Sequence, residues 1–106
     1  MSNLQFINEI GILGVALIKR DGILEDSLLP ENVDKETFSI MCATIYGAAT
    51  TVYSELNYKE SLNIVLYGKE LNLVIFPNSS RDFWAIMIPA NMDPIKAREE
   101  FIARKK

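Results

Sequence analysis

The longest regular pattern in the sequence is that of an amphipathic helix. Over residues 35–57, apolar side chains recur at three- and four-residue steps. At 100° per residue they fall within one stripe about 120° wide. Asp34 stands before the first turn, where its side-chain oxygen can accept a free backbone amide. The pattern predicts a helix over residues 35–57 with an inward face of Phe38, Met41, Cys42, Ile45, Ala49, Val52, Tyr53 and Leu56.

Shorter apolar runs predict five strands. The first two runs are separated by Asp21-Gly22, a strong hairpin signal. The last three are joined by short polar links and predict an antiparallel meander. The final run is apolar at every position, so it belongs in the middle of the sheet. The predicted strands are residues 12–19, 23–27, 62–67, 71–76 and 83–88.

Two shorter helices are expected near the ends of the sequence. Residues 4–10 precede Gly11, a helix-stop signal, and turn Leu4 and Ile7 inward. Asp93-Pro94 begins a second helix that continues to residue 103, because Asp suits the cap and Pro the first helical position. Ile95, Phe101 and Ile102 are expected on its inward face. The order of elements predicts one α/β (α+β) domain over residues 1–106, with helices on both faces of the sheet.

Composition adds a reason to expect association. The chain has 106 residues and is 49% hydrophobic, at the upper end of the range for globular proteins. That much apolar surface is difficult to bury within one small subunit. The net charge of −3 argues against nucleic-acid binding, which requires clustered cations. A single cysteine and the lack of a basic-then-apolar leader at the N-terminus lead us to expect a cytoplasmic protein.

The usual chemistry of catalysis is missing. The sequence contains no histidine, the commonest general base and metal ligand, and no glycine-rich phosphate-binding motif. Cys42 lies on the predicted apolar stripe, where a reactive thiolate is disfavoured. We therefore expect no enzymatic activity, no metal and no tightly bound cofactor.

The outward face of the long helix is unusual because it carries no charge. From Thr37 to Ser54, eighteen successive positions lack a charged residue, whereas a helix packed on a sheet normally has charges opposite its apolar stripe. The outward positions hold small residues, among them Ala43, Gly47 and Thr51 at four-residue spacing. A membrane span is excluded because Ser and Thr are too frequent there. An exposed face without a partner is the plainer alternative to packing against another helix.

A second copy of the same helix is the simplest partner, related by a two-fold axis. The predicted third strand supports this, because as a sheet edge free of charge it would be vulnerable unless paired with its own symmetry mate. The predicted dimer interface comprises Ile40, Ala43, Thr44, Gly47, Thr51, Ser54, Leu62, Asn63, Ile64, Val65 and Leu66.

Several segments together resemble the roadblock/dynein light chain domain family. They are Gly14-Val15-Ala16-Leu17-Ile18, Asp21-Gly22 and Ser27 in the first hairpin, and Asp34, Phe38, Met41, Ala43 and Gly47-Ala48-Ala49 in the long helix. The resemblance extends over residues 4–102, and no single motif is diagnostic. Two features depart from the family: the opening helix is shorter, and Met92-Asp93-Pro94 replaces the Leu-Gly that commonly follows Asn.

The resemblance implies a profilin-like five-stranded antiparallel sheet in the order 2-1-5-4-3 and a homodimer joined through the third strand and long helix. It also implies a role as a scaffold or regulator of small Ras-like GTPases, or as an adaptor in motor and signalling complexes. In some members the dimer promotes GTP hydrolysis by reshaping its partner, so no catalytic residue is transferred to this chain.

The leading hypothesis is a homodimeric regulatory subunit that binds a small Ras-like GTPase or a related NTPase. The residues expected to contact the partner lie near the ends of the long helix: Glu36, Ile40, Glu55 and Tyr58. One alternative is a profilin-like or PAS-like module that holds a small ligand between sheet and helix, and another is an adaptor without GTPase involvement. A ligand-sensing module needs polar groups in the core, but simple alternation points Asn63 and Asn72 outward.

Overall fold

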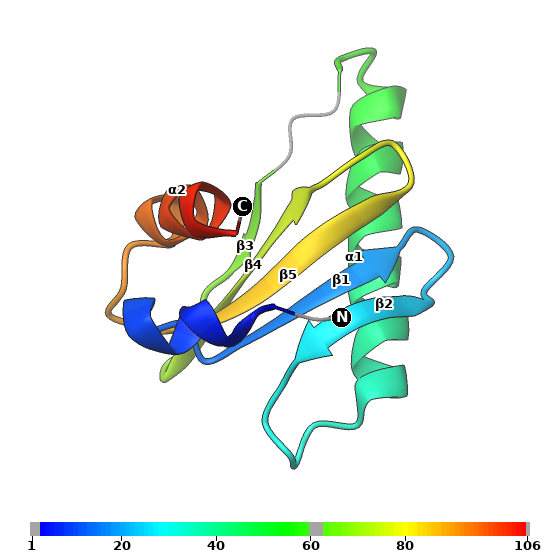
Figure 1. Ribbon diagram of the computed structural model, residues 1–106. Helices are drawn as coiled ribbons and strands as arrows, with labels where there is room; N and C mark the ends of the chain where they lie inside the picture. Colours follow the sequence, from blue (N-terminus) through cyan, green and yellow to red (C-terminus); the bar gives the residue numbers. More distant parts are fainter. Residues whose placement is uncertain (1–2, 60–62, 106) are drawn as a thin grey trace.

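The computed structural model describes residues 3–59 and 63–105 as a five-stranded antiparallel sheet between helices (Figure 1). The sheet order is β2-β1-β5-β4-β3, which confirms the predicted α+β class and strand order. Helix α1 covers one face, while the 3₁₀ helix η1 and helix α2 cover the other. The elements are η1 (Gln5–Ile10), β1 (Gly14–Lys19), β2 (Leu24–Leu28), α1 (Lys35–Glu55), β3 (Ile64–Leu66), β4 (Leu71–Pro77), β5 (Asp82–Pro89) and α2 (Pro94–Arg104).

The central strand of the sheet is β5, as the sequence predicted. Strand β5 pairs with both β1 and β4, so that Ile86 lies opposite Val15 on one side and Val74 on the other. All three side chains are fully buried. The two edges are β2 and β3. Strand β3 is shorter than the predicted 62–67, and the predicted Leu62 lies outside the described residues.

The face of α1 that packs on the sheet is rotated from the predicted one, because it keeps Phe38, Cys42 and Ile45 but also includes two residues that were not predicted. Tyr46 is buried and stacks on Phe83, with ring centroids 4.4 Å apart. Ser39 is also buried, because its hydroxyl donates a hydrogen bond to the carbonyl of Gly22. Cys42 is buried between them, as predicted.

Three members of the predicted inward stripe are instead exposed. Met41, Val52 and Leu56 keep 51%, 54% and 56% of their surface accessible. Periodicity showed an apolar stripe but not which sector of the helix faces the sheet. The neighbouring sector of α1 packs on the sheet instead. It supplies the Tyr46 ring, which stacks on Phe83, and the Ser39 hydroxyl, which donates to a carbonyl that would otherwise lack a partner.

On the opposite face of the sheet, aromatic side chains pack between the sheet and the helices η1 and α2. Phe101 of α2 contacts the rings of Trp84 and Phe6, with centroid distances of 4.9 and 5.5 Å. Leu4 and Ile7 are buried as predicted. The prediction that Ile95 points inward was wrong, since it is 41% exposed. It follows Pro94 in the first turn, and the buried positions of α2 are Ala97 and Phe101 further along.

Asn72 was predicted to point outward and is in fact buried. Its carboxamide oxygen accepts a hydrogen bond from the backbone amide of Gly68, 2.9 Å away, and its nitrogen donates to the carbonyl of Ala90 at 3.5 Å. Alternation fails here because β4 is covered on both faces. The side chain holds the β3–β4 link in place, and its polar atoms are already used by the backbone. Asn63 is exposed, as predicted.

Helix α1 ends two residues earlier than predicted. Leu56 caps it, and Asn57 follows with a φ of +62°. The amides of Asn57 and Tyr58 donate to the carbonyls of Ser54 and Tyr53, as in a Schellman motif. Tyr58 is thereby placed just beyond the end of the helix.

Candidate protein interface

The outer face of α1 exposes Ile40, Thr44, Gly47, Thr51 and Ser54. The hydroxyl of Thr44 donates to the carbonyl of Ile40 within the same helix. Because this polar group is satisfied internally, its methyl group is free to contact a neighbour. A Cβ atom built on Gly47 would meet nothing within 4 Å, so the small residue is not required by the subunit itself.

Ala43 lies off this outer face, contrary to its predicted position. It is half-buried and packs against the core cluster under α1. A Cβ on Gly22 would lie 3.9 Å from the Ala43 Cβ, which shows how closely the β1–β2 turn approaches this side of the helix.

An apolar stripe on α1 adjoins the outer face. We call it the α1 stripe, and it comprises Met41, Ile45, Ala48, Val52 and Leu56. Ile45 is partly buried against the core, whereas the other four are exposed. The spacing of three and four residues is that of a helix seam that packs against another helix. At 100° per residue, the stripe lies on the side of α1 opposite Ser39 and Ala43, and so faces away from the β1–β2 turn.

Strand β3 offers a free edge. Within the described residues, it pairs with β4 on one side and with no strand on the other. Ile64 and Val65 are half-buried and Leu66 is 43% exposed. No charged residue lies between Asn63 and Tyr67 to oppose pairing with another strand.

The four residues predicted to contact a partner are all exposed but occupy opposite ends of α1. Glu36 and Ile40 lie in its first two turns, whereas Glu55 ends it and Tyr58 follows with 73% exposure. A helix of 21 residues is about 30 Å long, so one subunit does not bring the two pairs together.

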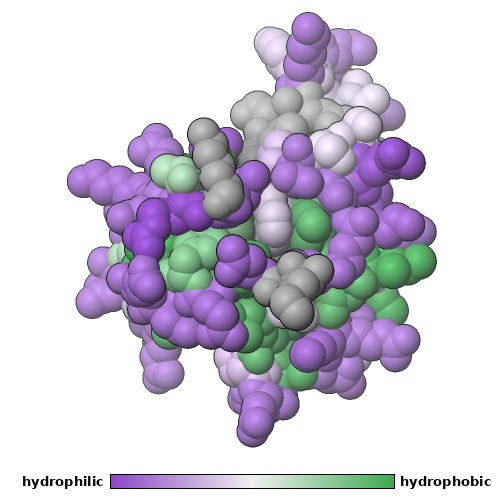
Figure 2. Space-filling view, in the orientation of Figure 1, coloured by the Kyte–Doolittle hydropathy of each residue, from purple (hydrophilic) through white to green (hydrophobic). Residues whose placement is uncertain are grey.

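Figure 2 shows the side of the molecule that carries η1 and α2. That side is largely hydrophilic, with hydrophobic patches at the lower and right margins and a paler one left of the centre (Figure 2). In the described part of the chain, no three His, Cys, Asp or Glu residues lie close enough to hold a metal ion. None of the described helices is both long and apolar enough to cross a membrane.

Burial makes Cys42 unsuitable as a nucleophile. Desolvation raises the pKa of its thiol from 9.0 to about 12, so the thiol is neutral at physiological pH. We expect Cys42 in the native protein to be alkylated at pH 8 about 100-fold or more slowly than free cysteine. Its thiol is protonated and the reagent cannot reach it. Mass spectrometry after iodoacetamide treatment measures this rate. Unfolding in concentrated urea should restore the rate of a free thiol, and rapid labelling of the native protein would contradict the burial.

Gly47 gives a second prediction, on stability. Gly47→Ala should raise the free energy of unfolding of the single subunit by about 1 kcal/mol, because Ala favours helix and the added methyl group meets no atom of the same chain. Urea unfolding at high dilution measures the effect. A loss of stability in the dilute subunit would show that the position is more crowded than it appears.

Comparison with known proteins agrees with this geometry. The sequence profile of the Roadblock/LC7 domain matches residues 4–82. No curated protein matches the sequence significantly. Among solved structures, MglB of Myxococcus xanthus superposes with a TM-score of 0.84 at 17% identity, over 95% of this chain and 82% of that chain. A Roadblock/LC7 domain from Streptomyces avermitilis gives 0.79 at 11% identity, over 88% and 78%.

A profilin from Schizosaccharomyces pombe gives a TM-score of 0.66 at 11% identity, over 96% of this chain and 90% of that chain. The sheet is thus profilin-like, as the sequence led us to expect. The profile match extends from the first turn of the structure into β5 and covers most of the sequence. The chain belongs to the Roadblock/LC7 domain family.

Proposed function

We propose that the chain is a non-catalytic regulatory subunit that forms a homodimer and binds a small Ras-like GTPase or a related NTPase, whose activity it modulates. The observation that carries the proposal is the surface of α1. A charge-free helix face and an apolar stripe lie beside each other, and apart from Ile45 neither is used by the core of the subunit. Membership of the Roadblock/LC7 domain family supports the same role.

The proposed dimer joins the β3 edges and the α1 helices of two copies. A two-fold axis perpendicular to the sheet would pair β3 with its symmetry mate and continue the sheet to ten strands, with both α1 helices on one face. The α1 stripe adds apolar area to the interface proposed from the sequence. Met41 and Val52 are each about half exposed, and would be covered in such a dimer. We expect a standard interface of about 800 Å² per subunit.

In such a dimer, the two-fold axis would also bring the proposed partner-binding residues together. It makes the two α1 helices antiparallel, so Tyr58 of one subunit lies toward the Glu36 end of the other. The helices then form a shared platform with residues from both ends at its rim. A platform that straddles the axis accepts one partner molecule per dimer.

The alternative of a ligand-sensing module finds less support. The space between α1 and the sheet is filled by the stacked rings of Tyr46 and Phe83 and by aliphatic side chains. Asn72, the buried polar residue in β4, has its carboxamide engaged with the backbone of Gly68 and Ala90. Little is therefore left to recognise a small molecule inside the domain.

Affinity capture tests the proposed partner. The tagged protein is incubated with native lysate in the presence of GDP or a non-hydrolysable GTP analogue, and bound proteins are identified by mass spectrometry. We expect a small GTPase that is enriched with one nucleotide over the other. Recovery of partners that include no NTPase would contradict the GTPase role and favour an adaptor.

A further inference from the structure

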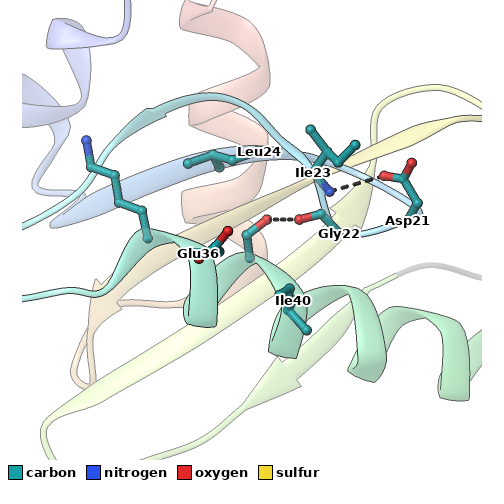
Figure 3. Close-up of a pocket in the computed structure, with 8 residues that line it drawn as sticks. Asp21, Gly22, Ile23, Leu24, Glu36 and Ile40 are labelled. Carbon is teal, nitrogen blue, oxygen red and sulfur yellow. Dashed lines mark hydrogen bonds between the residues drawn. The ribbon is translucent and has the colours of Figure 1, made fainter.

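A pocket of about 400 Å³ lies between the β1–β2 turn and the first two turns of α1 (Figure 3). Ile23 and Leu24 line it from the strand side, and Glu36 and Ile40 from the helix side. Two of these residues, Glu36 and Ile40, were expected from the sequence to contact a partner. Nothing in the sequence indicates the pocket itself, because it forms only where the turn packs against the helix.

The walls of the pocket are held in place before anything binds. The buried hydroxyl of Ser39 donates to the carbonyl of Gly22 and so ties the turn to the helix. Gly22 has a φ of +96°, and a Cβ at that position would lie 3.5 Å from the Ile40 side chain. Asp21 accepts a hydrogen bond from the amide of Ile23, which closes the turn. A pre-formed site loses less entropy on binding than one that must be ordered.

The walls of the pocket carry two exposed aliphatic side chains. Ile23 is 56% exposed and Ile40 is 47% exposed, and the two stand on opposite walls. An aliphatic side chain of a partner would cover both. Burial of one such side chain is a typical anchor of a protein interface.

The rim of the pocket is acidic. Asp21 and Glu36 line it together with a single cation, Lys35. Arg20, next to the turn, has its guanidinium over the Tyr46 ring, 5.1 Å from the centroid. The local field therefore favours a positively charged group on the incoming partner.

We propose that this pocket binds a protein segment in which an aliphatic side chain is flanked by Arg or Lys, and that it anchors the partner at the Glu36 end of the α1 platform. The proposal names the chemistry of the partner and in that sense rests on the proposed function. The aliphatic side chain enters between Ile23 and Ile40, and the flanking cation pairs with one of the rim carboxylates, Asp21 or Glu36.

The test uses short capped peptides and the isotope-labelled full chain. Ac-Gly-Arg-Leu-Gly-NH2 is titrated while backbone amide signals are followed by NMR. We expect saturable shifts at Gly22, Ile23, Ser39 and Ile40, with a dissociation constant on the order of 1–10 mM. Replacing Leu by Ser in the peptide should weaken binding about tenfold, the loss expected for one buried aliphatic side chain. Replacing Arg by Glu should weaken it about threefold or more.

Variants of the protein test whether the carboxylates at the rim cause the preference for the Arg peptide. Asp21→Asn with Glu36→Gln keeps the shape and the turn hydrogen bond but removes two charges, and should abolish the preference for Arg over Glu. Glu99→Gln with Glu100→Gln removes the same charge from exposed positions of α2 and should leave the preference intact. Ile40→Ala should weaken binding of both Leu-containing peptides alike.

Three results would overturn the proposal. The first is the lack of saturable shifts at the four amides, and the second is equal binding of the Arg and Glu peptides. The third is that the same amide signals shift when the protein concentration alone is raised, and that the peptide does not reverse the shift. Another copy of the chain would then occupy the pocket. The titration contains no GTPase, so a negative result bears on the pocket, whereas failure to capture an NTPase bears on the proposed function.

Discussion

Val52→Glu should convert the proposed dimer into a monomer. Val52 lies within the α1 stripe with 54% of its surface exposed, and the proposed interface would cover it against the second α1 helix. A glutamate there would be buried without a cation, because positions 37–54 contain no charged residue on either copy. An unpaired buried charge costs about 3–5 kcal/mol, which weakens association by more than about 100-fold. Sedimentation velocity of both proteins at the same concentration measures the change.

A matched control separates this effect from damage to the fold. Ile95→Glu places the same charge at a residue of similar exposure on α2, on the other face of the sheet, and should leave the dimer intact. Gly47→Glu tests the adjacent small-residue face. If Gly47→Glu gives a monomer and Val52→Glu does not, the helices meet through the small residues and the α1 stripe faces solvent.

Tyr58→Ala combined with Glu36→Lys should remove most of the affinity for the proposed GTPase partner while the proposed dimer persists. Tyr58 is 73% exposed just beyond α1 and presents an aromatic ring, the kind of side chain that anchors interfaces. Glu36 contributes negative charge at the other end of the helix, and its reversal would repel a basic partner. We expect a loss of about 2–4 kcal/mol, or a 30- to 1000-fold weaker complex.

Isothermal titration against the captured GTPase measures that loss, with the mass of the dimer checked in parallel. Glu99→Lys on α2 is the control for a change in net charge. Unchanged affinity of the double variant would place the docking site on the opposite face, beside η1 and α2.

The sequence was sufficient for features fixed by local chemistry. Asp34 accepts the amide of Thr37, and Asp93 accepts the amides of Ile95 and Lys96, so both predicted helix starts are confirmed. The central position of β5 followed from its uninterrupted apolar run, because only a strand covered on both faces tolerates one.

Features that depend on tertiary contacts were predicted less well. The inward face of α1 was only partly right, because Tyr46 and Ser39 find partners, Phe83 and the carbonyl of Gly22, that are remote in sequence. The burial of Asn72 was missed for the same reason, since its hydrogen-bond partner Ala90 lies eighteen residues away in the sequence. The pocket could not be predicted at all, because its two walls are separate elements whose distance is set by the packed core.

The central claim is that two copies of this chain associate through α1 and β3. Sedimentation equilibrium at micromolar concentration tests it most directly. We expect a mass twice the 12.0 kDa of the single chain, with dissociation on dilution that follows a monomer–dimer equilibrium. A single species of 12.0 kDa at those concentrations would contradict the dimer and the shared platform built on it.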